Sequence, residues 1–200
     1  MGLFSFLNFF KADKVITPSL NPNEYVPAFW EDDYCQVEIV PFENKAFIQK
    51  QAEQIDELAS KSKTNYGFTE TFGRGPMPVR TIAKEIRVNY FENTLTGFQF
   101  QKAKHIRYDK NEILDCENAK TKAFGFQNFT VFFDTEDEFV KNIWIHAGLI
   151  SSVTQFDLIK SALYALGEEC ELILIDWNSL ELFNLADKTQ IHKYLWGYWK

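Results

Sequence analysis

The sequence predicts an α+β domain in which a mostly antiparallel sheet is packed on one face by two or three helices. Three observations predict this fold class. Short runs of alternating or continuous apolar residues recur along the chain, longer runs repeat their apolar residues every three or four positions, and turn-forming residues separate the runs. The chain has 200 residues, of which 46% are hydrophobic and 24% charged, which excludes a mainly disordered or fibrous protein.

Residues 1–29 predict an N-terminal arm, and residues 30–200 predict a single α+β domain. Pro18, Pro22 and Pro27 favour extended chain over regular structure in this arm. Residues 3–10 are rich in Phe and predict a short helix or arm that packs against the body, with a weak membrane or partner contact as the alternative. The Phe-rich segment is too short to cross a bilayer and follows no basic residues, so a signal peptide is not expected.

The domain is predicted to begin with a strand over residues 34–40, which Pro41 ends, and a helix over residues 43–61. The strand is predicted from its alternating apolar residues, and the helix from apolar residues that share one face while charged residues occupy the other. Residues 72–78 contain two glycines and two prolines, which indicate a loop.

A hairpin is predicted over residues 86–100, because two short apolar runs flank a turn-like segment. Strands are expected over residues 104–108, 128–133 and 139–147. The acidic run from Asp134 to Glu138 separates the last two strands, and mutual repulsion favours a solvent-facing tip there.

The last third of the domain begins with a helix predicted over residues 152–166. Ser152 and Gln155 fit a capping box, and Gly167 is expected to end this helix. Residues 172–175 are continuously apolar and predict a central strand that is buried on both sides.

A turn over residues 176–179 is expected to reverse the chain after this strand. Leu180 and Leu182 then predict an antiparallel return, and the spacing of apolar residues over 187–196 predicts a short closing helix.

No motif in the sequence indicates a metal site, a cofactor or a catalytic residue. His105, His146 and His192 fall in three different elements, and no paired His or Cys spacing accompanies them. The dinucleotide fingerprint, the nucleophile elbow and the calcium loop are also missing, so no cofactor is expected.

The three cysteines, Cys35, Cys116 and Cys170, are odd in number and widely spaced, which favours a reducing cytoplasm over a disulfide framework. Cys35 and Cys170 stand among apolar residues and are expected to be structural thiols.

Charge is distributed unevenly along the chain. Lys and Arg number 21 against 28 Asp and Glu, so the net charge is −7, which disfavours nucleic-acid binding through phosphates. Residues 134–187 hold 11 acidic and two basic residues, a net −9, whereas residues 74–107 hold seven basic and two acidic residues, a net +5. An acidic region of this kind is either a solvated face or a steering surface for a basic partner.

The candidate partner-binding residues are carboxylates of the acidic region and an aromatic anchor: Asp134, Glu136, Asp137, Glu138, Asp176 and Trp177.

Three segments carry a resemblance to a known group of proteins. They are the opening Met1-Gly2-Leu3-Phe4, the segment Trp30-Glu31-Asp32-Asp33-Tyr34, and the segment Leu172-Ile173-Leu174-Ile175-Asp176-Trp177. In general character, over most of its length, the chain resembles the immunity proteins of bacterial polymorphic-toxin and contact-dependent-inhibition systems. The resemblance implies a cognate toxin and a tight one-to-one complex. These families differ in fold, so no functional residue is carried over.

The favoured function is therefore a non-catalytic immunity protein that binds and neutralises a basic toxin, for example a nuclease. The alternatives are a small cytosolic enzyme whose Cys/His or carboxylate site forms only in the folded chain, and an oligomer-forming module. A single deep pocket that holds a cysteine or two carboxylates with a histidine would favour the enzyme. A broad acidic, aromatic face without a pocket would favour the inhibitor, and a large apolar face would favour the oligomer. We expect a cytoplasmic monomer or weak dimer with no metal, cofactor, membrane or nucleic-acid partner.

Overall fold

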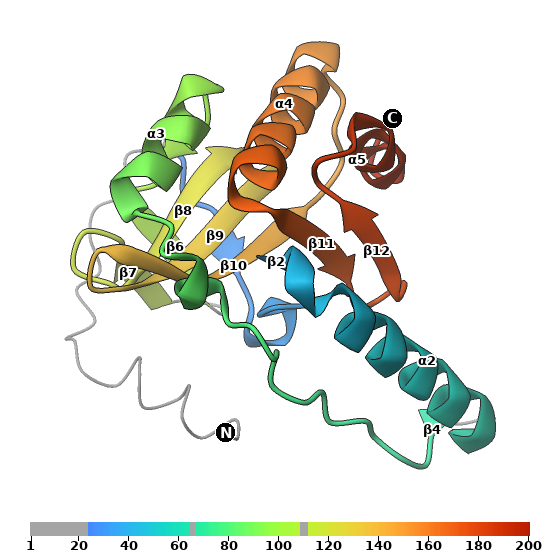
Figure 1. Cartoon of the computed structure of the whole chain (residues 1–200). Coiled ribbons are helices and arrows are strands. Elements are labelled where there is room, and N and C mark those ends of the chain that lie inside the picture. The colour runs from blue at the N-terminus through green and yellow to red at the C-terminus, as the bar shows by residue number, and fades with distance from the viewer. Residues whose placement is uncertain (1–23, 65–66, 109–111) are drawn as a thin grey trace.

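The computed structural model describes residues 24–64, 67–108 and 112–200. Its centre is a seven-stranded antiparallel sheet, and helices pack on the sheet, so the predicted α+β class is confirmed (Figure 1). In sheet order the strands are β12 (Glu181–Asn184), β11 (Leu172–Asp176), β2 (Val37–Pro41), β10 (Phe139–Ala147), β9 (Phe129–Glu136), β8 (Thr121–Phe126) and β5 (Gln101–Lys102).

Two small sheets accompany the large one. The first has the order β1 (Ala28–Phe29), β6 (His105–Tyr108) and β7 (Glu112–Asp115), with β1 parallel to β6. The second pairs β3 (Lys63–Thr64) with β4 (Gly67–Phe68).

Three helices cover one face of the large sheet: α3 (Val88–Gly97), α4 (Val153–Cys170) and α5 (Lys188–Trp196). The fourth, α2 (Lys45–Ser62), packs on the opposite face and extends away from the body in Figure 1. The prediction of helices on one face is therefore wrong for α2. Its buried Ile48 contacts Val40 and Ile173, and the side chains of these strand residues point away from α4 because neighbours in a strand alternate between faces. The described residues also form three short 3-10 turns: η1 (Glu31–Asp33), η2 (Phe42–Asn44) and η3 (Thr81–Lys84).

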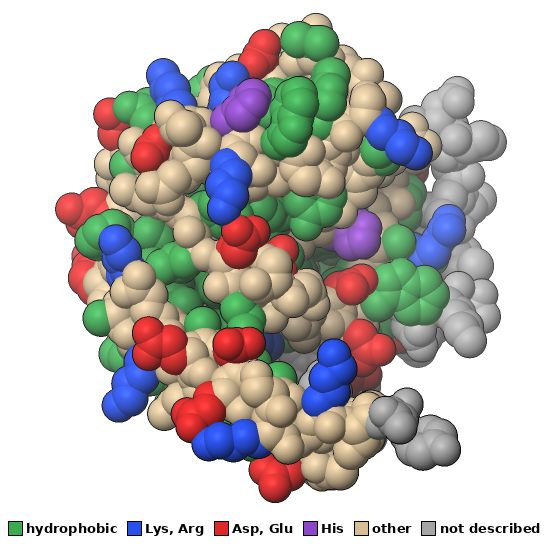
Figure 2. Space-filling model, turned by 90° about the vertical axis from the view of Figure 1, so that its right-hand side faces the viewer, with side chains coloured by type: hydrophobic (Ala, Val, Ile, Leu, Met, Phe, Trp, Pro, Cys, Tyr) green, Lys and Arg blue, Asp and Glu red, His purple; other side chains and the backbone are tan. Residues whose placement is uncertain are grey.

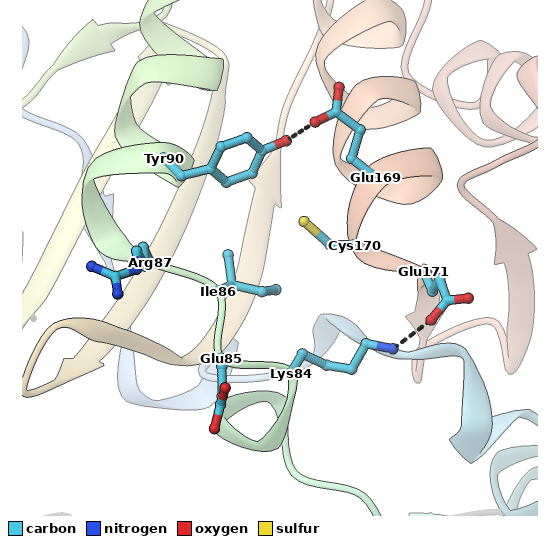
Figure 3. Close-up of a pocket in the computed structure, with 8 residues that line it drawn as sticks. All are labelled: Lys84, Glu85, Ile86, Arg87, Tyr90, Glu169, Cys170 and Glu171. Carbon is cyan, nitrogen blue, oxygen red and sulfur yellow. Dashed lines mark hydrogen bonds and ion pairs between the residues drawn. The ribbon is translucent and has the colours of Figure 1, made fainter.

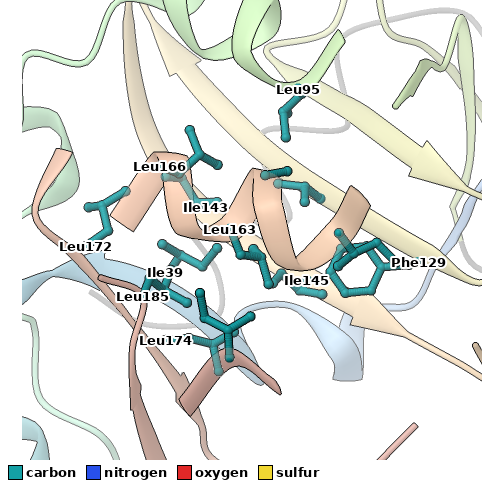
Figure 4. Close-up of a cluster of buried hydrophobic side chains, with 14 of the residues drawn as sticks. Ile39, Leu95, Phe129, Ile143, Ile145, Leu163, Leu166, Leu172, Leu174 and Leu185 are labelled. Carbon is teal, nitrogen blue, oxygen red and sulfur yellow. The ribbon is translucent and has the colours of Figure 1, made fainter. Parts of the chain in front are cut away.

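The main core lies between the sheet and helices α3, α4 and α5 (Figure 4). Ile39, Ile143 and Leu174 come from neighbouring strands, and Leu163 and Leu166 come from α4. Full burial of one such side chain stabilises the fold by about 1.5–3 kcal/mol. The continuous apolar run of β11 is buried at every position, as predicted for a central strand.

The opposite face of the sheet has two smaller apolar clusters. One lies under β1 and β6 and includes Phe29, Phe132 and Trp144. The other lies under α2 and includes Ile48 and Ile175. Between them this face carries polar side chains, among them Glu38, Asp134 and Asn142.

Most elements occur where the sequence predicted them. The structure confirms the hairpin of β9 and β10, the turn after β11, the antiparallel return of β12 and the closing helix α5. The hydroxyl of Ser152 accepts a hydrogen bond from the backbone N–H of Gln155 and so caps α4.

Two predictions about individual elements are also wrong. The hairpin over residues 86–100 is replaced by α3, because Phe91 and Leu95 are four positions apart and are both fully buried against the sheet. Gly167 does not end α4. The helix continues to Cys170, and Glu171 is its C-terminal cap. A Cβ atom at Gly167 would lie 2.2 Å from the Cβ of Leu185, so this glycine permits a close approach of the chain inside the helix.

Part of the predicted N-terminal arm packs on the body. Tyr25 shares a hydrogen bond of 2.7 Å with Thr130, and Phe29 is buried beside Trp144. The Phe-rich segment over residues 3–10 lies outside the described residues, and its packing stays a prediction. None of the helices in the described ranges is long and apolar enough to cross a bilayer.

Candidate functional site

One end of the large sheet gathers acidic side chains from several parts of the sequence. At this end β10 begins, β2 ends and β11 begins, because Ile143 pairs with Ile39 and Leu172 pairs with Pro41 in antiparallel register. We call it the acidic end and define it by seven carboxylates: Glu43, Glu85, Glu136, Asp137, Glu138, Glu169 and Glu171.

Backbone hydrogen bonds fix the segments of the acidic end against one another. The N–H of Val88 donates to the carbonyl of Glu138 at 2.9 Å, and the N–H of Val140 donates to that of Ile86 at 2.9 Å. The N–H of Phe42 donates to the carbonyl of Glu171 at 2.8 Å. These bonds therefore fix the β9–β10 turn, the chain before α3 and Glu171, the first residue after α4.

A pocket of about 550 Å³ opens between the start of α3 and the end of α4 (Figure 3). The Tyr90 hydroxyl donates to Glu169 across it, and the Lys84 ammonium bridges Glu43 at 3.0 Å and Glu171 at 2.8 Å. Its lining residues are Lys84, Glu85, Ile86, Arg87, Tyr90, Glu169, Cys170 and Glu171.

Three carboxylates of the acidic end stand on left-handed backbone. Glu85, Asp137 and Glu171 have φ values of 51°, 55° and 53°. Glycine adopts this region without strain, whereas an L side chain there costs roughly 1–2 kcal/mol. The chain therefore carries acidic side chains at three turn positions where glycine would strain the backbone less.

The contacts and the burial of groups at the acidic end shift several of their pKa values. The ammonium of Lys141 holds the pKa of Glu136 below its usual range through a hydrogen bond and its charge. Burial, with the hydrogen bond to Glu169, raises the pKa of Tyr90 to about 12. Burial also raises the pKa of the Cys170 thiol, so this thiol is protonated at neutral pH and is a poor nucleophile. The arrangement is suited to pairing with cationic groups.

The predicted tip residues divide between this surface and the interior. Glu136, Asp137 and Glu138 stand at the β9–β10 turn, and Glu138 pairs with Arg87 at 3.0 Å. Asp134 does not: it lies within β9 and is only 8% exposed, so the prediction of a solvent-facing position is wrong for it.

Neutral donors compensate the burial of the Asp134 carboxylate. It accepts hydrogen bonds from Thr121 at 2.7 Å, from Tyr34 at 3.1 Å and from Asn142 at 3.2 Å. Thr121 and Asn142 belong to the strands on either side of β9. The position that the sequence assigned to a charged tip is thus a hydrogen-bonded part of the sheet.

Trp177 and Asp176, predicted as partner contacts, are also buried. The indole N–H of Trp177 donates to Glu38 at 3.2 Å, and the guanidinium of Arg74 lies 4.9 Å from the centre of its ring. Arg74 also donates to Glu38 at 3.1 Å and to the carbonyl of Cys35 at 3.0 Å. Burial raises the pKa of Glu38 to about 7.

The sequence did not identify this cluster, because Arg74 and Glu38 lie 36 positions apart and belong to no motif. It also did not place Glu85 beside the start of β10, or Glu171 beside the end of β2. Their acidic character was visible in the charge count, but their position depends on the order of the strands.

The other candidate residues are dispersed. His105 contacts Glu24 at 2.6 Å, His146 lies 3.8 Å from Asp33, and His192 belongs to α5. Within the part of the chain that the structure describes, no group of three or more His, Cys, Asp or Glu side chains is arranged to hold a metal ion.

The two remaining cysteines have protonated thiols. Burial raises the pKa of Cys35 well above its usual range and that of Cys116 to about 12.

In comparisons with known proteins, no family model, no curated protein and no solved structure matches this chain.

Proposed function

We propose that this chain is a non-catalytic binding protein, an immunity protein that neutralises a basic toxin through its acidic end. One observation carries the proposal. The two acidic runs of the sequence, at residues 136–138 and 168–171, stand at the same end of the sheet, where backbone hydrogen bonds hold Glu138 and Glu171 in place and the second run lines a pocket.

Such a surface would attract a basic protein before contact. Clustered carboxylates create a negative potential that steers a cationic partner and speeds encounter, and salt screens this effect. A toxin that binds nucleic acid needs a cationic surface of its own, because it must neutralise phosphates. Carboxylates in a rigid arrangement could occupy that surface and block it.

The acidic end keeps charges available for a partner. The side chains of Glu138 and Glu171 are 60% and 74% exposed, and the pair of Glu138 with Arg87 is a surface ion pair of small net worth. A partner's cations can therefore compete for Glu138 at low cost.

The test compares two triple variants with equal loss of charge. Glu136→Gln/Asp137→Asn/Glu138→Gln neutralises the β9–β10 turn, and Glu53→Gln/Asp56→Asn/Glu57→Gln removes three charges from the exposed face of α2. Immobilised wild type and variants are incubated with lysate of the native cells, and retained basic proteins are identified and then expressed alone to measure toxicity.

The proposal predicts a retained basic protein that is toxic alone and harmless when co-expressed with the chain. Its association with the turn variant should slow by about tenfold or more at low salt, with little change for the α2 variant. Equal association rates for the two variants, or retained proteins without toxicity, would contradict it.

A small enzyme is the second candidate, because the pKa of Glu38 near 7 is suited to a general base at neutral pH. Its carboxylate lies beside Arg74 and the Cys35 turn. Rapid labelling of Cys35 by a thiol reagent at neutral pH, together with loss of an activity, would favour this candidate; slow labelling supports a structural thiol.

A further inference from the structure

The pocket between α3 and α4 has an apolar floor and an aromatic wall. In Figure 3 the side chains of Tyr90, Ile86 and Cys170 face a common space, and those of Glu85 and Arg87 turn away from it. Ile86 and Cys170 are buried, whereas Tyr90 is half-buried and presents its ring to the pocket. A side chain that enters this space must therefore have an apolar part.

A carboxylate stands at the rim of the pocket beside the Tyr90 ring. The Tyr90 hydroxyl donates to one carboxylate oxygen of Glu169, an exposed residue in the last turn of α4. Within the described residues Glu169 makes no ion pair, and its other oxygen accepts no hydrogen bond. A carboxylate has acceptor sites on both oxygens, so Glu169 can bind a further donor without losing Tyr90.

The pocket carries an excess of negative charge. Its two lining cations, Lys84 and Arg87, are paired with three carboxylates: Glu43, Glu138 and Glu171. With Glu85 and Glu169, the lining residues and these ion-pair partners comprise five carboxylates and two cations, a net −3. Three further basic side chains act on Glu136, which does not line the pocket: Lys141, Arg80 and Lys120.

We propose that this pocket receives an arginine side chain of the basic partner, with the guanidinium stacked on the Tyr90 ring and donating to Glu169. Its methylene stem then packs on Ile86 and Cys170. The inference rests on the proposed function for the identity of the partner. Arginine has the two parts that the pocket requires, because its apolar stem packs on apolar surface while its head remains charged.

The chemistry of the pocket favours a guanidinium over an ammonium group. A guanidinium is planar, so it stacks on an aromatic ring while its N–H groups reach a carboxylate in the same plane. It is also more weakly hydrated than an ammonium, so it loses less when it enters a partly apolar space. The ammonium of Lys84 already occupies the position between Glu43 and Glu171 that suits a compact charge.

NMR titration of the isotope-labelled full chain with N-acetylarginine amide tests this inference. N-acetyllysine amide carries the same charge, and N-acetylnorleucine amide has an apolar stem without charge. The arginine probe should give saturable chemical-shift changes at residues 84–90 and 169–171, with an affinity roughly threefold or more above that of the lysine probe. The norleucine probe should give no saturable change there.

Two glutamines on neighbouring residues separate the pocket from the general charge of the surface. Glu169→Gln should weaken binding of the arginine probe by about fivefold or more, because a charge-assisted hydrogen bond is lost. Glu168→Gln is the matched control: Glu168 is exposed and accepts a hydrogen bond from Tyr164 at 2.8 Å, but it does not line the pocket. Its loss should change the affinity by less than about twofold.

The ring of Tyr90 is tested by a second pair of variants. Tyr90→Leu removes the stacking surface and should weaken binding of the arginine probe by about threefold or more. Tyr90→Phe keeps the ring and leaves Glu169 free to accept from the guanidinium, so binding should be retained. Circular dichroism of all four variants checks that the fold is kept.

A titration without saturable shifts at the pocket would overturn the inference, and so would equal affinities for the three probes or equal losses for Glu168→Gln and Glu169→Gln. The titration needs no toxin, so the two proposals fail separately. If no toxic protein is retained from lysate while the arginine probe binds as described, the proposed function fails and the guanidinium site stands. A toxin whose affinity is unchanged by Glu169→Gln would overturn the pocket inference and leave the proposed function standing.

Discussion

The two ends of α4 differ in charge and in the kind of side chain that they expose. The C-terminal end faces exposed carboxylates on strained turns and a pocket, whereas the N-terminal end faces the stacked rings of His192, Trp196 and Trp199 (Figure 2). Long-range charge makes the first suited to fast, salt-sensitive encounter, and short-range packing makes the second suited to contact that persists in salt. One helix thus separates a charged surface from an aromatic one.

The two ends are also assembled differently. The acidic end joins the β9–β10 turn, the chain before α3 and the end of α4, which are far apart in sequence. The stacked rings at the other end of α4 come from two segments, at residues 149–156 and 192–199, that a parallel bridge between Ile150 and Trp199 aligns. A change to the sheet should therefore disturb the acidic end more than these rings.

The largest expected effect comes from adding a side chain at Gly167, where α4 lies against Leu185. Gly167→Ala should destabilise the fold by about 3 kcal/mol or more, because the new Cβ would meet the side chain and backbone of Leu185. Chemical denaturation measures the free energy of unfolding.

Gly197→Ala, directly after α5, is the matched control. A Cβ there would meet the carbonyl of Tyr194 at 3.4 Å, an ordinary contact, and the backbone is helical. Its stability should change by less than about 1 kcal/mol, and the change should be favourable. Comparable losses for the two alanines would contradict the difference in packing.

The second expected effect is a pH dependence that originates in neither end. Folding raises the pKa of Glu38 from 4.5 to about 7, so the folded state favours the protonated carboxyl. The stabilisation is complete below pH 4.5 and is lost as pH rises through about 7. Over that range Glu38 should cost the wild type at most about 3 kcal/mol, since one pKa unit corresponds to about 1.36 kcal/mol.

Glu38→Gln removes this titration. The free energy of unfolding of the variant minus that of the wild type, measured from pH 4.5 to 8, should therefore increase with pH. A difference that is flat with pH would show that Arg74 and Trp177 stabilise the charged form enough to cancel the effect of burial.

The smallest expected effect sharpens the distinction between stability and recognition at the acidic end. Asp137→Gly and Glu171→Gly should each stabilise the fold by about 1 kcal/mol, because glycine relieves the left-handed backbone. Both variants should bind a basic partner more slowly, since each removes a carboxylate from the acidic end. Thermal denaturation and association kinetics on the same samples measure the two effects.

Asn substitutions at these two positions serve as a comparison, because asparagine tolerates left-handed backbone but carries no charge. If the glycine variants are more stable than the wild type but associate with the partner at the same rate, these carboxylates have no part in recognition.

Local pattern was sufficient for elements whose periodicity agreed with their final packing. The apolar spacing along α2, the cap at Ser152 and the continuous run of β11 led to elements that the structure contains. It failed for α3, because Ile86, Val88 and Tyr90 alternate like a strand while Phe91 and Leu95 face the core with helical spacing. Packing against the sheet decided between two periodicities present in the same segment.

The sequence by itself determined the α+β class, the acidic balance of the chain and the carboxylates at the β9–β10 turn. Only the tertiary structure decided which charges are exposed. It buried Asp134, whose carboxylate accepts hydrogen bonds from Thr121, Tyr34 and Asn142. It also brought Glu85 and Glu171 to the end of the sheet that bears Glu138. The physical reason is that composition and spacing act along the chain, whereas burial and local potential depend on strand order, which brings distant residues together.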